Sequence, residues 1–350
     1  MLKLKTLESD RPALQDHAWP PVPPFVQLDP ELRDFLAVDR AGREHILAAR
    51  RADPDAQGRF LHDSLGVIYG YVYGYPDSPC RLRADVDMEA ALQTAKLELE
   101  QEMIERWLGP RPVPHIRDQQ AAVVYLRDFA LGNAGVHHRL FDYLRDDVPR
   151  HAMIEFLRLE VCRNEVVDDE VALLVCGLQG NMKKVMVSNL WDECGNGQLE
   201  RFHTYWLRRL IDGLGDWQDL PTYRMTGKPW FSTITSNSLN SLLTRPAYKL
   251  RAYGHFLVTE GWVEPHFERI LAGLERVGLG HDDIAVYFQA HCKIDPHHTE
   301  EMLEGLQYQV PALSAAEATE VVWGAHLAAA AGLAQYERVL RHLRALPAPA

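Results

Sequence analysis

The chain of 350 residues is long enough for one large domain or two smaller ones with a sizeable core, and its composition agrees with a soluble protein. Its formal net charge of −12 and its scattered basic residues argue against nucleic acid as a partner. No stretch approaches eighteen consecutive apolar residues, and the N-terminus has no apolar core of signal-peptide length, so we expect a cytoplasmic protein without a membrane span. The five cysteines show no paired spacing, so neither a disulfide framework nor a zinc ribbon is expected.

The first part of the chain divides into an arm and a helical region. Residues 1–28 are rich in proline, which predicts an extended arm. A helical pattern starts at Asp29, as cap, and Pro30, in the first turn, and residues 29–148 form the predicted N-terminal helical region. Helices are expected there at 88–108, 119–131 and 136–144. Residues 66–75, rich in Tyr, Val and Ile, are the best strand candidate, although the same run also suits a buried helix.

The later half of the chain, residues 149–345, is predicted to be a helical domain. The last helix opens with Ser314-Ala-Ala-Glu317, the spacing of a capping box. No strands alternate with the helices, so a doubly wound sheet is not expected and the predicted fold class is all-α. The expected helices are 149–167, 169–177, 181–193, 199–213, 238–259, 264–277, 281–291 or beyond, and 314–343.

A run within this half, His291-Cys-Lys-Ile-Asp295-Pro-His-His298, carries three metal-binding side chains. On a helix, at about 100° per residue, Asp295 lies about 40° from His291 and His298 about 20° to the other side. All three can therefore point at one centre. Two imidazoles and a carboxylate leave coordination positions open, which suits non-haem iron that must also take oxygen and a substrate.

Pro296 opens a second interpretation of the same run. Asp295 could cap a new helix that begins at Pro296, in which case the alignment of His291 with His298 is accidental. A helix that is kinked at Pro296 still directs all three side chains inward. We adopt the kinked helix as the prediction.

A second cluster lies upstream, where Glu193 and His203 flank a glycine pair. Ten residues of uninterrupted helix would place these two side chains about 80° apart. Gly195 and Gly197 permit a local break that turns both side chains inward. The alternative is an ordinary loop between two helices, with Glu193 solvated and His203 in the core.

Together these residues resemble the haem-oxygenase-like diiron oxidases, also called iron-containing redox enzymes. Members carry an Asp-Glu pair, a glycine-rich segment and a His ten residues after the Glu. A lone Glu then precedes a His-x3-Asp-x2-His helix by about thirty residues, as Glu260 precedes His291 here. The resemblance covers about residues 150–310, and it implies that the catalytic and metal-binding residues are Glu193, His203, Glu260, His291, Asp295 and His298.

The resemblance implies a haem-oxygenase-like helical bundle over residues 149–345 with an N-terminal helical extension. Two Fe(II) ions would be the cofactor, O2 the co-substrate and an electron donor the partner. The implied activity is C–H oxidation, desaturation or cleavage, cyclisation or N-oxygenation of a small metabolite in specialised metabolism, bearing an amine and a carboxylate, with an amino acid as the expected substrate. Some members add a carboxylate on the preceding helix, where Glu160 is the candidate ligand; the alternative is a solvated helical acid.

Polar residues near the proposed ligands are candidates for binding the substrate. A cation beside iron could hold a substrate carboxylate, which makes Arg201 and Lys293 candidates together with Tyr205. The alternative is that these long side chains extend into water. Further candidates are Tyr287, Gln289 and the hydroxyl- and amide-rich run 232–240.

Two other functions stay open at this point. A ferritin-like diiron protein would need a Glu-x-x-His on each of two helices, and only Glu200-Arg-Phe-His203 fits. A non-catalytic helical protein that binds haem or another planar ligand would use His203 or His291 as an axial ligand or a core residue. The oligomeric state is not fixed by the sequence, and a homodimer is one option.

Overall fold

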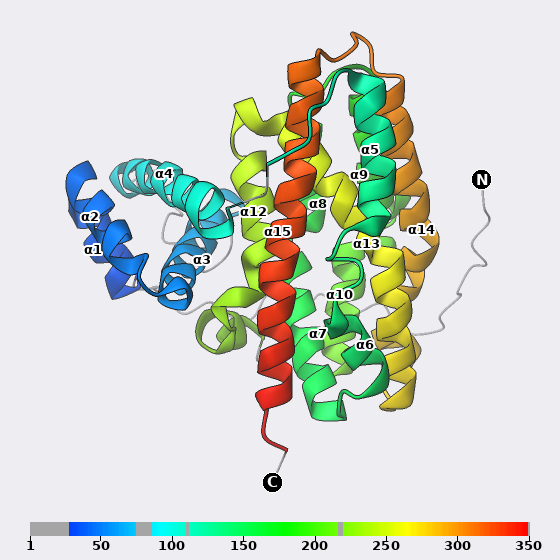
Figure 1. Ribbon diagram of the computed structural model, residues 1–350. Coiled ribbons are helices and arrows are strands. Elements are labelled where there is room, and N and C mark those ends of the chain that lie inside the picture. The colour runs from blue at the N-terminus through cyan, green and yellow to red at the C-terminus, as the bar shows by residue number, and fades with distance from the viewer. Residues whose placement is uncertain (1–27, 75–85, 110–111, 216–219, 349–350) are drawn as a thin grey trace.

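The computed structural model describes residues 28–74, 86–109, 112–215 and 220–348. All secondary-structure elements within these ranges are helices (Figure 1), which confirms the predicted all-α class. The predicted proline-rich arm, apart from its last residue, lies outside the described residues. None of the described helices combines the length and the apolar character that crossing a lipid bilayer requires.

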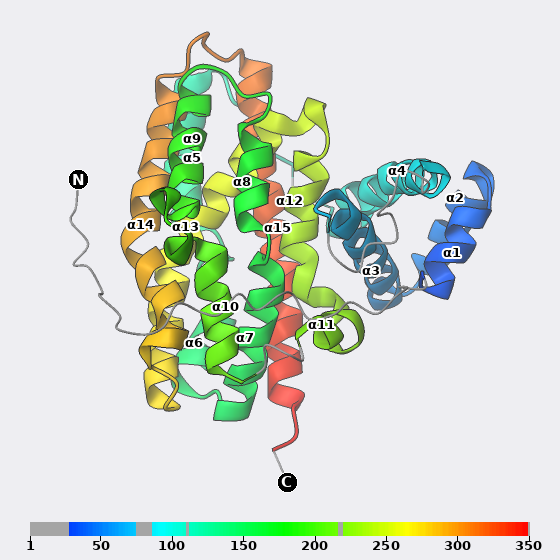
Figure 2. The ribbon, with the colours of Figure 1, turned by 180° about the vertical axis from the view of Figure 1, so that it is seen from behind.

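The first group of helices stands to one side of the main bundle (Figures 1 and 2). As predicted, the first helix begins with Asp29 accepting a hydrogen bond from the Glu31 backbone and with Pro30 in its first turn. α3 packs against α12 of the bundle, and η2 packs against α15. The group consists of α1 (Pro30–Ala37), α2 (Arg40–Arg50), α3 (Pro54–Val72), α4 (Val86–Gln101) and the π-helix η2 (Glu102–Leu108).

The strand candidate at residues 66–75 is a helix as far as the structure describes it. Residues 66–72 form the end of α3, and Ile68 and Tyr69 on this stretch are buried. The β-branched and aromatic residues thus contact a core from a helix, because the run of apolar residues alone does not distinguish a buried helix from a strand.

The bundle contains the remaining helices. Its shorter elements are α5 (Gln119–Gly132), α6 (Arg139–Asp146), α7 (Arg150–Asn164), α8 (Val167–Val175), α9 (Gly180–Glu193), η3 (Gly195–Gly197), η4 (Leu199–Arg201), α10 (His203–Gly213), α11 (Leu220–Thr222), η5 (Tyr223–Gly227), η6 (Trp230–Thr233), α12 (Ile234–Leu243) and η7 (Pro246–Tyr248). Three long helices complete it: α13 (Lys249–Arg276), α14 (Asp282–Gln307) and α15 (Ala315–Ala345). The predicted capping box between Ser314 and Glu317 is present at the start of α15.

The helix α13 lies at the centre of the bundle, where it packs against α5, α6, α12, α14 and α15. Its closest approach is to α15. A Cβ atom on Gly254 would overlap the Val321 carbonyl oxygen, and one on Gly324 would overlap the Arg251 carbonyl oxygen. The two backbones are therefore in direct contact, which fixes the face of α13 that turns toward the bundle interior.

Two predicted helix boundaries are wrong. The sequence favoured helices at 238–259 and 264–277, with a break near Pro265. The chain instead leaves the α-helix between α12 and α13, and α13 passes through Pro265 without interruption. The free energy gained by packing one long helix against its neighbours exceeds the cost of the one backbone hydrogen bond that proline cannot make.

Two more helices than expected belong to the bundle. α5 and α6 lie within the predicted N-terminal region, residues 29–148, yet α5 packs against α13, α14 and α15 and α6 packs against α13 and α15. In Figure 1 only α1–α4 stand apart from the bundle. The predicted division at residue 149 stays a prediction, but the packed bundle begins earlier in the chain, at α5.

Candidate metal centre

The glycine segment between α9 and α10 brings Glu193 and His203 together. Glu193 is the last residue of α9 and His203 the first residue of α10. Between them Gly195, Asn196 and Gly197 all have positive φ angles, of 56°, 56° and 80°. Such angles suit glycine and are tolerated by asparagine. The chain therefore breaks and turns here, as the glycine pair indicated.

The turn closes on itself. Cys194 and Phe202 form an isolated antiparallel bridge, and a Cβ atom on Gly195 would overlap the Arg201 backbone. The close approach requires glycine at this position, because any side chain would push the two limbs of the turn apart.

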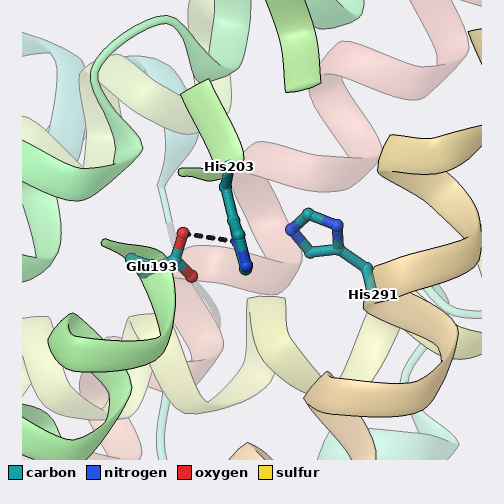
Figure 3. Close-up of side chains that lie close together, drawn as sticks. All are labelled: Glu193, His203 and His291. Carbon is teal, nitrogen blue, oxygen red and sulfur yellow. Dashed lines mark ion pairs between the residues drawn. The ribbon is translucent and has the colours of Figure 1, made fainter. Parts of the chain in front are cut away.

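The first potential ligand group consists of Glu193, His203 and His291, which Figure 3 shows converging from three helices. One ligand atom from each lies within 4.8 Å of the others. His203 Nδ1 is 2.7 Å from Glu193 Oε2, but the contact lacks hydrogen-bond geometry, and both atoms and His203 Nε2 have no hydrogen-bond partner. Buried polar atoms are almost always satisfied. Unsatisfied nitrogen and oxygen atoms that converge in this way fit a bound cation.

The second group consists of Glu193, Glu260 and His298, again with ligand atoms within 4.8 Å of one another. His298 Nδ1 lies 3.2 Å from Glu260 Oε2, and His298 Nε2 lies 3.3 Å from Asp192 Oδ2. A neutral imidazole has one donor, whereas both of its nitrogens face carboxylates here. This arrangement suits either a doubly protonated ring or a cation between one nitrogen and its carboxylate.

The two groups share Glu193, and all five side chains are buried. Burial favours the neutral form of Glu193, but His203, His291 and His298 lower the pKa of this carboxyl below its ordinary value. Burial raises the pKa of Glu260. Burial and the neighbouring His203 lower the pKa of His291 to about 3, so its ring is neutral near pH 7, as a metal ligand must be.

The remaining proposed ligand, Asp295, has a side chain outside the described residues. The backbone around it answers the question raised by Pro296, since α14 runs without interruption from Asp282 to Gln307. The interpretation in which Asp295 caps a new helix is therefore wrong. His291 and His298 belong to one helix and face the same centre.

A cavity adjoins the two groups and is lined by Glu193, Glu260 and His291. Its volume is about 80 Å³. Apolar lining residues include Phe256, Val263 and Phe267, and the polar ones include Arg163, Glu170, Thr235, Ser236, His255 and Tyr287. A small molecule in this cavity would lie directly beside the potential ligands.

Several residues proposed from the sequence lie elsewhere. Glu160 is buried, but its Oε2 accepts a hydrogen bond of 2.7 Å from Arg163 Nη2, and neither ligand group among the described residues includes it. Lys293 is exposed, Arg201 at the end of η4 and Tyr205 in the first turn of α10 are half-buried, and the described lining of the cavity contains none of the three. Long basic side chains on a helix surface reach toward water.

The cavity also has polar residues that the sequence analysis did not single out. Arg163 and Glu170 look like ordinary charged helical residues in the sequence, yet both line the cavity. Asp192, which contacts His298, precedes Glu193 and was visible only as part of the Asp-Glu pair. Of the polar candidates named from the sequence, Tyr287 and the two polar residues Thr235 and Ser236 of the run 232–240 line the cavity, whereas Gln289 is exposed.

Comparisons with known proteins identify the family. A family model described as "Iron-containing redox enzyme" matches residues 154–333, just over half of the chain. A crystal structure of a CADD-like protein of unknown function from Nostoc punctiforme is similar, with a TM-score of 0.51, 14% sequence identity, and coverage of 64% of this chain and 97% of that chain. At this identity the likeness shows the fold, which is the predicted haem-oxygenase-like helical bundle. No curated protein matches the chain. The resemblance found in the sequence is thus confirmed, and the chain belongs to the family of iron-containing redox enzymes.

Proposed function

We propose that this protein is a non-haem diiron oxidase that uses O2 to oxidise a small metabolite with an amine and a carboxylate, and that this metabolite is an amino acid. The observation that carries the proposal is the double use of Glu193, which belongs to both ligand groups. A carboxylate has two oxygens and can bridge two cations. A site for one metal would give no reason for two overlapping sets of buried ligands.

The donor set supports iron in particular. Imidazole nitrogens and carboxylate oxygens together suit Fe(II). When bound, a pair of ferrous ions supplies the oxidising chemistry with O2 that protein side chains lack. An external electron donor belongs to the proposal, because oxidised iron needs electrons to return to the ferrous state.

The residues around the potential ligands orient two of the imidazole rings. His291 Nδ1 lies 2.6 Å from the Tyr287 carbonyl oxygen and donates to it, so the Nε2 lone pair faces the centre. Trp206 stacks on His203 with ring centroids 5.0 Å apart, and Phe267 packs edge-on against His291 at 5.6 Å. These contacts hold both rings in one orientation.

His298 has a carboxylate beside each ring nitrogen. If one nitrogen binds a cation, the other can still donate its proton to a carboxylate, Glu260 on one side or Asp192 on the other. Hydrogen bonds of this kind fix the ring tautomer and raise the basicity of the ligating nitrogen. Asp192 is therefore proposed as a positioning residue.

The cavity supports a short polar substrate. Its small volume favours a compact molecule over a long acyl chain, and its lining offers a guanidinium and a carboxyl group beside an apolar wall. The ferritin-like alternative gains no support, because Glu200, the acid of the single Glu-x-x-His, is exposed and lies outside both described ligand groups.

Metal analysis tests the proposal. Protein that has been stripped with a chelator and reloaded anaerobically should bind two ferrous ions per chain, show no Soret band, and consume O2. His291→Ala should lose most of this O2 consumption and retain the helical circular dichroism. His326→Ala is the matched control, since this histidine stacks on Phe129 and belongs to neither ligand group. One ion per chain, a haem spectrum, or full O2 consumption by His291→Ala would contradict the proposal.

A further inference from the structure

The cavity beside the ligand groups contains charged and polar atoms that the metal centre does not use. Arg163, on α7, extends into it with the Nε atom buried and without a hydrogen-bond partner. Its Nη2 donates to Glu160 Oε2 at 2.7 Å. Burial opposes the charge, but Glu160 outweighs this effect and the pKa of the guanidinium is raised above its ordinary value. Arg163 is therefore a permanent cation held in place by Glu160, with donors left over for a ligand.

Glu170, on α8, is the acidic group of the same cavity. Its Oε1 accepts a hydrogen bond of 2.8 Å from Asn240 Nδ2. The amide is held in this orientation, because Asn240 Oδ1 accepts a hydrogen bond from the Tyr73 hydroxyl. Glu170 is thus positioned by Asn240 on α12, which Tyr73, the residue after α3, orients in turn. Burial raises the pKa of the Glu170 carboxyl to about 8, so a cationic amino group beside it would favour its charged form.

His255, on α13, adds an acceptor. The Ser238 hydroxyl donates its single proton to the Thr235 carbonyl oxygen at 2.8 Å, so it accepts from His255 Nε2 at 2.7 Å. In this tautomer His255 Nδ1 carries a lone pair, and it is buried without a hydrogen-bond partner. Burial lowers the pKa of His255 to about 3, which keeps the ring neutral near pH 7.

We propose that Arg163 binds the carboxylate of an amino acid substrate and that Glu170 and His255 Nδ1 receive its amino group. A planar guanidinium matches a carboxylate, and a buried carboxyl and an imidazole lone pair are both acceptors for N–H donors. The three residues line one cavity and come from three helices of the bundle. This inference rests on the proposed oxidase function and adds the residues that select the substrate class.

The test uses the iron-loaded protein and a panel of matched probes. The panel contains the twenty common amino acids, the primary amines that lack their carboxylates, and the carboxylic acids that lack their amino groups. Binding is measured anaerobically by calorimetry. At least one amino acid should bind about tenfold or more tightly than both of its truncated counterparts, because each lost partner leaves a buried polar group unpaired.

Two variants assign the ends of the ligand. Arg163→Gln should weaken binding of the amino acid about tenfold or more and leave binding of the matching amine unchanged. Glu170→Gln should weaken binding of the amino acid and leave binding of the matching carboxylic acid unchanged. Arg163→Lys keeps the charge beside Glu160, which protects the fold, and should show an intermediate loss because lysine cannot present two parallel donors.

The matched control is Arg224→Lys. Arg224 is, like Arg163, half-buried and paired, with Nη1 2.6 Å from Glu165 Oε1, but it does not line the described cavity. This variant should bind the whole panel like the unmodified protein. The proposal is overturned if no member of the panel binds, if a truncated probe binds as tightly as its amino acid, or if Arg163→Gln weakens amines and amino acids equally. Iron content is measured in the same samples. Two ions per chain without selective amino acid binding contradict only this inference, whereas fewer than two ions per chain contradict the diiron proposal itself.

Discussion

Replacement of Glu193 by glutamine tests whether this carboxylate is shared by two metal sites or serves only one. Glutamine keeps the size of the side chain and one oxygen but removes the charge. Because Glu193 belongs to both ligand groups, both ions lose a charged contact. Losing a charge-assisted contact costs about 1.5–3 kcal/mol, which weakens the affinity for each ion by about 10- to 150-fold.

The change can be measured as the stabilisation that iron confers. At free Fe(II) a hundred times the dissociation constant, each ion raises the free energy of unfolding by about 2.7 kcal/mol, so two ions contribute about 5 kcal/mol. With affinities about 10- to 150-fold weaker, the stabilisation of the Glu193→Gln variant by both ions together falls to about 0.6–2.8 kcal/mol. Anaerobic urea unfolding with and without Fe(II) gives both values.

Glu102→Gln is the control for loss of a buried, paired carboxylate. Glu102 and Glu193 are each 3% exposed, and Glu102 Oε1 accepts a hydrogen bond of 2.7 Å from Arg51 Nε far from the ligand groups in the chain. Glu102→Gln should lose stability equally with and without Fe(II). The reasoning is refuted if Glu193→Gln keeps the full gain, and a loss of only one ion's share would mean that Glu193 serves a single site.

Two further predictions concern the fold. Gly324→Ala should lower the free energy of unfolding by about 1–3 kcal/mol in urea, because the added methyl meets the Arg251 carbonyl oxygen, whereas Gly132→Ala, with open space around it, should not lower it; equal effects would contradict the close packing of α13 and α15. Burial lowers the pKa of both His62 and His255 to about 3 from an ordinary 6.5, so the folded state binds fewer protons and stability is lost as pH falls below about 6.5. Between pH 7 and 5.5, iron-free His62→Gln should lose about 1.3 kcal/mol less stability than the unmodified protein, and identical pH profiles would contradict the assigned burial of this ring.

The sequence predicted which potential ligands lie close together wherever the spacing alone constrains the side chains. His291 and His298 are seven residues apart and share a face of any continuous helix. Glu193 and His203 needed a break, and the glycines that provide it were visible in the sequence. The approach of Glu260 to His298 depends on how α13 packs against α14, so only the resemblance to a family could pair these two residues.

The polar residues of the cavity were harder to predict, because a charged residue on a helix is normally solvated. Glu170 follows two aspartates at the start of α8 and resembles an acid that favours a helix N-terminus. Its burial depends on contacts with α12, which local sequence does not encode. The error at Pro265 has the same origin, since packing along α13 decides whether a helix continues through proline.

The N-terminal helices reach the candidate site although they lie outside residues 154–333, which the family model matches. The Tyr73 hydroxyl donates to Asn240 Oδ1, and an amide whose oxygen is engaged in this way must turn its NH2 group toward Glu170. An asparagine flipped by half a turn would instead present its oxygen to the Glu170 carboxyl. The residue that follows α3 therefore orients the amide that contacts Glu170 at the cavity, and the extension is linked to the candidate site as well as packed against α12.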